Sequence, residues 1–204
     1  MIRFFDIIIS LYVIVLLLPV IVVIGIIISL DSRGGVFFFQ TRVGQYGRDF
    51  NLIKFRTMRV GAEQHGALTV GARDSRITAP GIFLRKFKLD ELPQLFNVLK
   101  GDMSLVGPRP EVRRYVDMYS PAQRIVLTVK PGITDYASIE FVDENEILGS
   151  SRDPEMTYIL YVMPAKIELN RRFIDNPGTK QYFAILLKTI IKIAGPGRGS
   201  RPVA

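Results

Sequence analysis

The most prominent feature of the hydropathy pattern is an uncharged apolar run at residues 7–30, made up mainly of isoleucine, valine and leucine. As a straight helix this run would measure about 36 Å, enough to cross a hydrocarbon core about 30 Å thick. Pro19 lies in its middle and lacks a backbone N–H, so we expect the helix to kink there. Each half is then too short to span a bilayer. The pattern allows either a re-entrant hairpin or a kinked spanning anchor.

Cationic residues flank the run on both sides: Arg3 precedes it, and Arg33, Arg42 and Arg48 follow it. Because Lys and Arg are enriched in cytoplasmic loops, this arrangement slightly favours the re-entrant hairpin, with both ends in the cytoplasm. A cleaved signal peptide is less consistent with the sequence. The run is longer than the apolar region of such a peptide, and no small-residue cleavage site follows it.

After the run, the pattern predicts two strands, at residues 36–43 and 50–58. Gly44 and Gly47 lie between them, which is typical of a short β-hairpin connection. Residues 63–79 are polar and contain glycine, so we expect a loop there.

Three segments downstream have the patterns of helices, two short and one longer. Pro93 suits the first turn of the first one, where its missing N–H costs nothing, and Gly101 is a typical stop. Pro164 interrupts the third. The predicted helices lie at residues 94–100, 111–119 and 153–173.

At residues 182–193 apolar side chains recur at helical spacing, with Lys188 and Lys192 on the other side. Such a basic amphipathic helix can lie in a membrane interface or pack on the core of its own protein. The sequence therefore predicts an α+β protein with a small, mostly helical domain, a β-hairpin and interfacial amphipathic helices. The predicted units are residues 1–31 (membrane helix), 32–177 (catalytic domain), 178–194 (amphipathic C-terminal helix) and 195–204 (flexible tail).

Composition narrows the possible functions. The 204 residues include 27 Lys and Arg against 19 Asp and Glu, a formal net charge of +8, and no cysteine. Disulfides and thiolate metal sites are thus excluded, and with His65 as the only histidine, expected on an exposed loop, a Ser-His-Asp triad is improbable. A basic protein suits nucleic acid, anionic lipid or phosphorylated substrates, and the apolar run favours anionic membrane lipids over nucleic acid.

Asp90 and Glu91 are the main candidates for catalysis, because they form an adjacent acid pair at the start of a predicted helix. The positive end of the helix dipole keeps carboxylates ionised and attracts phosphate. Either acid could bind Mg²⁺, which takes one or two carboxylates plus substrate phosphates, and a carboxylate can also attack phosphorus. Alternatively, the pair only caps a helix and pairs with Arg85 or Lys88.

Four cations could neutralise phosphate charge beside this pair. Lys54 and Arg56 are expected on one face of the second strand, because strand side chains alternate. Arg109 lies between Pro108 and Pro110, whose rings stiffen the backbone that presents a fork-shaped guanidinium. The candidate phosphate-binding residues are therefore Lys54, Arg56, Arg85 and Arg109.

With these motifs the chain resembles the monotopic phosphoglycosyl transferases, bacterial enzymes that begin lipid-linked glycan assembly. The resemblance covers nearly all of residues 1–193, and the ordered set of motifs is highly specific. The strongest segments are residues 54–58 (KFRTM), 85–95 (RKFKLDELPQL), 101–110 (GDMSLVGPRP) and 130–134 (KPGIT).

The resemblance implies a two-step reaction at the bacterial inner membrane, on its cytoplasmic face. Asp90 would attack the sugar-linked phosphate of a UDP-sugar and release UMP, and a polyprenyl phosphate, typically undecaprenyl phosphate, would then take the phosphosugar. Mg²⁺ would be held by Asp90, and Glu91 would help to activate the lipid phosphate. Arg85 and Arg109 match basic positions of the same motifs. The resemblance also implies a re-entrant helix broken at Pro19.

Two positions depart from the pattern of this family. Many relatives have Ser before the helix-breaking proline, whereas this chain has Leu18. Many relatives also have Gly after the KPGIT segment, whereas this chain continues with Asp135, so family contacts for the sugar or nucleotide are not assigned to residues 135–141. Two other functions use the same features: a membrane-associated nucleotide-sugar hydrolase or phosphatase with the same aspartyl nucleophile, and a non-catalytic membrane scaffold.

Overall fold

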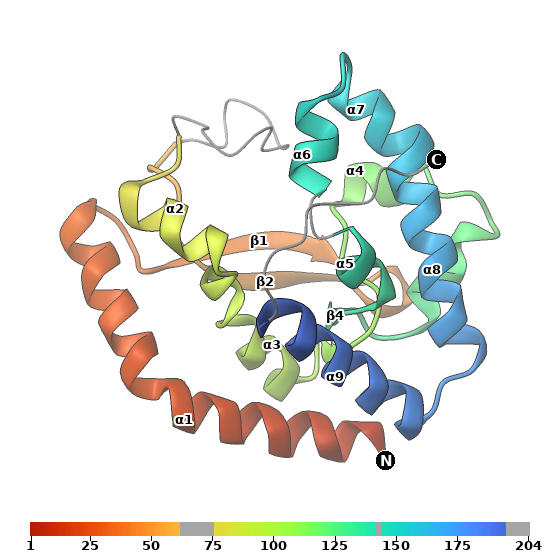
Figure 1. Cartoon of the computed structure of the whole chain (residues 1–204), viewed down its shortest axis with the longest axis horizontal. Helices are drawn as coiled ribbons and strands as arrows, with labels where there is room; N and C mark the ends of the chain where they lie inside the picture. The colour runs from red at the N-terminus through yellow and green to blue at the C-terminus, as the bar shows by residue number, and fades with distance from the viewer. Residues whose placement is uncertain (62–75, 142–143, 195–204) are drawn as a thin grey trace.

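The computed structural model describes residues 1–61, 76–141 and 144–194. His65, most of the predicted loop at residues 63–79 and the predicted tail at residues 195–204 lie outside the described residues. In the described part of the chain helices dominate, and the strands form two small sheets (Figure 1). These elements confirm the predicted mixed fold, with a long apolar helix at the N-terminus.

The apolar run forms α1 (Ile2–Asp31), a single helix that contains Pro19. In Figure 1 its ribbon follows the outside of the molecule and changes direction midway. Ile14, Ile21 and Ile28 on its inner face are buried in the protein core. Its outer face is apolar and exposed, since only 17% of its most apolar window is buried. By length and composition α1 could cross a membrane, so re-entry remains a prediction.

The predicted hairpin is present as β1 (Phe37–Val43) and β2 (Asp49–Phe55), which pair antiparallel. The connection is a short 3₁₀ turn, Gln45–Gly47, in which Gly47 has the left-handed φ of 73° that glycine tolerates. The predicted end of the second strand at residue 58 is wrong. β2 ends at Phe55, and Met58 instead forms an isolated bridge with Ile77.

α2 (Ala79–Lys86) and α3 (Gln94–Lys100) are joined by a 3₁₀ turn at Leu89–Glu91. α3 follows Pro93 and ends at Gly101, which has a left-handed φ of 99°. The predicted start and stop of this helix are both confirmed.

The second half of the chain contains more elements than the sequence predicted. In order these are β3 (Ser104–Val106), α4 (Arg113–Val116), a 3₁₀ helix (Gln123–Thr128), β4 (Gly132–Thr134), α5 (Tyr136–Glu140), α6 (Glu144–Gly149), α7 (Pro154–Thr157), a π-helical turn (Tyr158–Val162), α8 (Met163–Asp175) and α9 (Thr179–Ala194). β3 and β4 pair parallel, a short ladder that no alternation in the sequence had indicated.

Two predicted helices differ from the observed ones. α4 is shorter than residues 111–119: it starts only at Arg113, since the Glu111 carbonyl accepts from the Val43 N–H of the hairpin at 2.9 Å, and it ends at Val116. Pro164 does not stop the third helix, which continues from α7 to α8 through the π-helical turn just before it. Proline lacks the N–H of the regular ladder, and a π turn is one way for a helix to absorb such a defect.

α9 uses its apolar residues on two sides. Tyr182 and Ile185 are fully buried in the core, whereas Leu187 and Ile190 are exposed. The helix therefore packs on the core of its own protein. Its other apolar side is exposed, and its location in a membrane interface remains a prediction.

Two polar residues in the first turns of α1 fix this helix to the domain. The Arg3 guanidinium donates to the carbonyls of Val98 and Leu99 at the C-terminal end of α3. Asp6 is 2% exposed, and its Oδ1 accepts from the Ser104 hydroxyl at 3.0 Å and from the Leu105 N–H at 2.9 Å, both in β3. The Tyr182 hydroxyl of α9 donates to the same oxygen at 2.9 Å. One buried carboxylate thus joins α1, β3 and α9.

We expect Tyr182→Phe to destabilise the protein, because it deletes this hydroxyl without creating a large cavity. Loss of one buried hydrogen bond to a carboxylate should lower the free energy of unfolding by about 1–3 kcal/mol. Thermal unfolding of the detergent-solubilised protein measures the change. Tyr161→Phe is the matched control, since Tyr161 is 71% exposed. Equal melting temperatures for the two variants would contradict a stabilising role of the Asp6 contact.

Candidate active site

The acid pair lies on the 3₁₀ turn between α2 and α3. Lys88 precedes it with a left-handed φ of 57°, so the chain reverses sharply after α2 and turns Asp90 inward, where it is 7% exposed. Neither acid caps α3, which starts at Pro93 without a side-chain cap. Glu91 forms no ion pair with Arg85 or Lys88 among the described residues. The helix-capping alternative is therefore not supported by the structure.

Glu91 is held by two cations from distant segments. Lys54 of β2 contacts its Oε1 at 3.1 Å, and the Arg109 guanidinium, from the segment after β3, binds both of its carboxylate oxygens, with Nη1 to Oε2 at 3.1 Å. Burial alone would raise the pKa of Glu91, but attraction by Arg109 and Lys54 holds that pKa well below its usual range. Glu91 is therefore ionised at neutral pH, with both oxygens engaged.

Asp90 has the opposite environment. Burial and the adjacent charge of Glu91 raise its pKa, and the nearby charges of Lys54 and Arg85 oppose this effect. Among the residues that the structure describes, no group donates a hydrogen bond to the Asp90 carboxylate. A buried carboxylate without donors is poorly stabilised as an anion, which leaves its oxygens available to a metal ion or to an electrophilic phosphorus.

The predicted cations do not all converge on this pair. Lys54 and Arg109 contact Glu91 directly. Arg85, in the last turn of α2, donates through Nε to the Thr57 hydroxyl at 2.9 Å, and its charge acts on Asp90. Burial lowers the pKa of Lys54, and the charge of Glu91 opposes this effect.

Arg56 has a different position from the one expected. It is 8% exposed, and its guanidinium donates to the carbonyls of Ser32 at 2.7 Å and Arg33 at 3.1 Å, where α1 ends. Gly34 passes so close that a Cβ there would lie 1.9 Å from Arg56 Nη1. Lys54 and Arg56 therefore do not present their charges to one site, because the strand ends between them. Arg56 holds the end of the apolar helix against the hairpin.

Sequence reasoning missed a second group of buried or partly buried polar residues near Arg109. Arg42 of β1 donates to the Pro110 carbonyl at 3.0 Å and lies 3.7 Å from the Glu111 carboxylate. Lys166 of α8, 8% exposed, pairs with Glu144 at 3.0 Å, and Tyr158 donates to Glu111. These residues come from five separate segments without a shared motif, so no sequence signal connected them.

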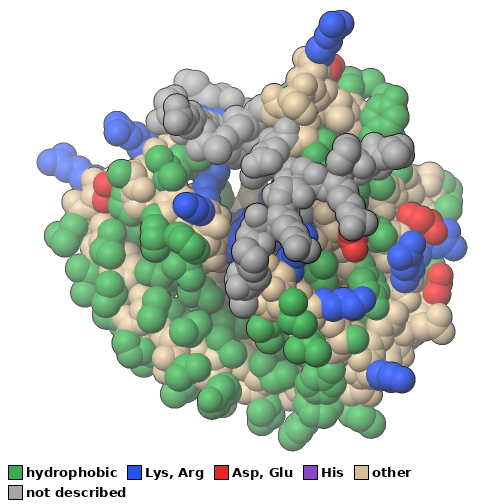
Figure 2. All heavy atoms as spheres, viewed as in Figure 1, with side chains coloured by type: hydrophobic (Ala, Val, Ile, Leu, Met, Phe, Trp, Pro, Cys, Tyr) green, Lys and Arg blue, Asp and Glu red, His purple; other side chains and the backbone are tan. Residues whose placement is uncertain are grey.

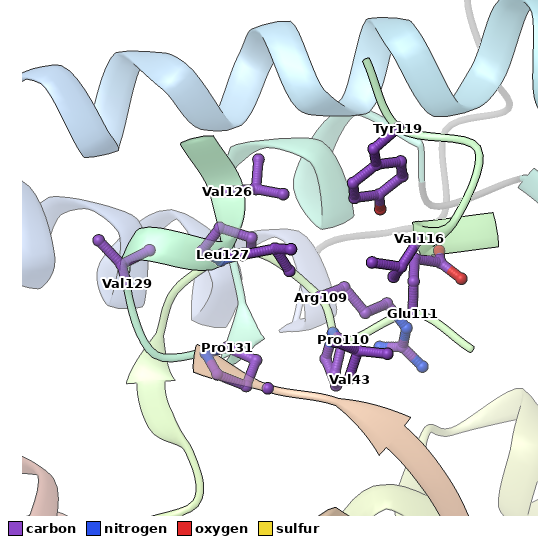
Figure 3. Close-up of a pocket in the computed structure, with 12 residues that line it drawn as sticks. Val43, Arg109, Pro110, Glu111, Val116, Tyr119, Val126, Leu127, Val129 and Pro131 are labelled. Carbon is purple, nitrogen blue, oxygen red and sulfur yellow. The ribbon is translucent and has the colours of Figure 1, made fainter. Parts of the chain in front are cut away.

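A small cavity lies on the other side of the Arg109 segment (Figure 3). It has a volume of about 20 Å³ and is walled mainly by apolar side chains, among them Val126, Leu127 and Pro131. This space suits about one water molecule and no larger ligand. A nucleotide sugar would therefore have to approach Asp90 from outside this cavity.

The described residues contain no group of three or more His, Cys, Asp or Glu side chains that could hold a metal. Asp90 nevertheless fits as a single protein ligand for Mg²⁺, because its buried carboxylate accepts no hydrogen bond from the described residues. Glu91 fits less well, since both of its oxygens are bound by cations. Mg²⁺ commonly binds through one or two carboxylates and completes its shell with water and substrate phosphate oxygens.

Comparison with known proteins identifies the family of this chain. The model of the bacterial sugar transferase family matches residues 1–195, and the chain belongs to this family. The matched region includes α1, the acid pair Asp90 and Glu91, and Arg109.

Several curated relatives share much of the sequence. A UDP-N-acetylgalactosamine-undecaprenyl-phosphate N-acetylgalactosaminephosphotransferase of Aeromonas hydrophila is 40% identical over 202 residues, which is 98% of this chain and 44% of the relative. A UDP-glucose:undecaprenyl-phosphate glucose-1-phosphate transferase of Xanthomonas campestris pv. campestris is 42% identical over 182 residues, which is 87% of this chain and 35% of the relative. The chain thus spans half or less of the length of these two relatives.

A third relative is a putative undecaprenyl-phosphate N-acetylgalactosaminyl 1-phosphate transferase of Bacillus subtilis (strain 168). It is 51% identical over 94 residues, which is 46% of this chain and 52% of the relative. The names of all three proteins include undecaprenyl phosphate; two name N-acetylgalactosamine as the sugar and one names glucose.

We expect Glu91→Gln to destabilise the fold, because it leaves Lys54 and Arg109 close together without their anion. Removing one partner of a largely buried ion pair should cost about 2–4 kcal/mol in the free energy of unfolding. Chemical denaturation in detergent measures the loss. Glu155→Gln is the matched control: Glu155 pairs with Arg114 on the surface, and its loss should cost less than about 1 kcal/mol. A Glu91 variant as stable as this control would show that the cations do not depend on Glu91.

Proposed function

We propose that this protein moves a phosphosugar from a UDP-sugar to a polyprenyl phosphate, through a covalent intermediate on Asp90. The observation that carries this proposal is the contrast between the two acids: Glu91 is ion-paired through both oxygens, whereas Asp90 is buried and accepts no hydrogen bond from the described residues. The family and the undecaprenyl-phosphate transferases among its relatives support the class of reaction.

In the first step a carboxylate oxygen of Asp90 attacks the phosphorus that carries the sugar. An O–P bond forms to Asp90, the bond between the two phosphates breaks, and UMP leaves with the bridging oxygen. Because burial raises the pKa of Asp90, the carboxylate is a stronger nucleophile than an exposed one. Lys54 and Arg85 place positive charge where the phosphoryl group becomes more negative.

In the second step a phosphate oxygen of the polyprenyl phosphate attacks the same phosphorus. The bond to Asp90 breaks, the free carboxylate is restored, and the product is a polyprenyl diphosphate sugar. Glu91 is held close to this centre by Arg109 and Lys54, where it can orient or activate the incoming lipid phosphate. When bound at Asp90, Mg²⁺ would supply charge neutralisation for the diphosphate.

The surface of the protein supports a location at a membrane. Figure 2 shows hydrophobic side chains gathered along the side of the molecule formed by α1, with further apolar groups over α2 and α9. The exposed residues include Val15, Ile26, Phe83 and Ile190. A contiguous apolar surface of this extent is unusual for a soluble monomer and typical of a membrane contact. We propose that this side is embedded in the bacterial inner membrane from the cytoplasm, where polyprenyl phosphate is accessible.

We expect Asp90→Asn to abolish turnover, because an amide cannot form the acyl phosphate. The assay follows UMP release and lipid product from a panel of UDP-sugars with Mg²⁺, with and without polyprenyl phosphate. Wild-type protein should release UMP and form polyprenyl diphosphate sugar, and Asp90→Asn should fall by at least about a thousandfold in both. Asp117→Asn, which removes an exposed carboxylate, is the control and should retain full activity.

Other outcomes of this assay identify other functions. Water-soluble sugar phosphate without lipid product would indicate a hydrolase that uses the same aspartate. Absence of UMP release with every UDP-sugar would favour a non-catalytic scaffold. Retained turnover in Asp90→Asn would remove Asp90 from the mechanism, as would the absence of a phosphosugar adduct on the Asp90 peptide in rapidly quenched wild-type protein.

The re-entrant arrangement of α1 predicts that both of its ends face the same side of the membrane. The chain has no cysteine, so single cysteines can be labelled specifically. One is inserted after Met1, and the other replaces Gly35, where a Cβ meets only the Phe37 carbonyl oxygen at 3.7 Å. We expect an impermeant thiol reagent to reach both from the cytoplasmic side of membrane vesicles. Labelling of the two positions from opposite sides would establish a spanning helix instead.

A further inference from the structure

The segment that presents Arg109 is attached to β4 by a series of backbone contacts. The Gly107 N–H donates to the Thr134 carbonyl at 3.0 Å, and the Gly132 N–H donates to the Pro108 carbonyl at 2.9 Å. The two glycines lie against each other, so that a Cβ on Gly132 would lie 2.1 Å from Gly107 N. Residues 107–108 are therefore fixed by close backbone packing.

Residues 108–110, which follow Gly107, have a single backbone N–H donor among them. Pro108 and Pro110 lack an N–H, so only Arg109 can donate. Its N–H donates to Oδ2 of Asp135 at 3.1 Å. Asp135 is 2% exposed and directly follows β4.

Asp135 uses its other carboxylate oxygen for a second task. It is the N-cap of α5, and its Oδ1 accepts from the Ser138 N–H. The two donors use different oxygens of this carboxylate, so a side chain that keeps an oxygen only at the position of Oδ1 would cap α5 but leave the Arg109 N–H without its acceptor. The carboxylate thereby connects the end of β4, the start of α5 and the backbone of the arginine that holds Glu91.

We propose that Asp135 is a positioning residue for the reaction: it fixes the Arg109 backbone so that the guanidinium clamps Glu91 beside Asp90. This proposal rests on the proposed function. In this chain the position of Arg109 depends on a side chain as well as on the backbone.

Asp135→Ser separates the two tasks of this carboxylate. Serine is as good an N-cap as aspartate, so α5 keeps its cap, but serine has no second oxygen in the place of Oδ2, so the Arg109 N–H loses its acceptor. Asp153→Ser is the matched control. Asp153 caps α7 through the Met156 N–H at 3.0 Å, carries the same charge and has no contact with Arg109.

Activity is measured as kcat/KM for UMP release, in both single variants and in the Arg109→Ala background. Displacement of a positioned group should reduce kcat/KM of Asp135→Ser by about ten- to a hundredfold, while Asp153→Ser stays at the wild-type value. In Arg109→Ala the Asp135→Ser change should have no further effect, because the residue it positions is already gone. Full activity of Asp135→Ser, or additive losses in the double variant, would overturn the proposal.

Amide hydrogen exchange tests the same link without turnover. In wild-type protein the Arg109 N–H should be protected by Asp135, and in Asp135→Ser the peptide covering residues 104–112 should exchange faster, with the α5 peptide unchanged. Equal exchange in that peptide would overturn the link. Failure of the wild-type protein to release UMP from any UDP-sugar would count against the proposed function instead, and the exchange result would still decide whether Asp135 fixes Arg109.

Discussion

The active-site geometry depends on one ionic interaction, the clamp of Arg109 and Lys54 on Glu91. Adjacent carboxylates repel each other, and a buried pair would normally ionise in two separated steps. Here Arg109 and Lys54 determine which of the two acids ionises first. They hold the pKa of Glu91 well below its usual range, whereas the pKa of Asp90 is raised by burial and by the anion next to it. Glu91 is thereby held as an ion-paired anion, and the oxygens of Asp90 accept no hydrogen bond from the described residues.

This interaction is built from distant parts of the chain, and the apolar helix helps to hold them together. Arg3 binds the C-terminal end of α3, whose other end follows the acid pair. Asp6 binds β3, which leads to Arg109, and Arg56 binds the C-terminal end of α1 next to the strand that carries Lys54. Because the helix binds α3, β3 and the end of the hairpin, it supports the candidate site as well as being the proposed membrane element.

The sequence predicted local features well and long-range ones poorly. The hairpin, the limits of α3 and the place of the acid pair follow from glycine, proline and alternation, which act over a few residues. The partners of Lys54 and Arg56 could not be predicted, because strand alternation gives a face only while the strand lasts, and β2 ends between these two residues. Asp6 was missed because it lies at the edge of the apolar run. Asp135 was noticed only as a departure from a family pattern, since its contact with Arg109 depends on the parallel pairing of β3 with β4, two strands of three residues each.

The small size of the charged centre favours the proposed covalent route over direct transfer between the two proposed substrates. Both proposed substrates carry phosphate, yet the cations near Asp90 come from one compact set, and two of them are already engaged with Glu91. A direct reaction would need this set to neutralise a nucleotide diphosphate and a lipid phosphate at the same time. A phosphosugar held on Asp90 lets UMP leave before the second phosphate arrives, so the same cations can serve each phosphate in turn. In the proposed reaction the two substrates would approach from different environments, the nucleotide sugar from water and the polyprenyl phosphate along the apolar side of α1.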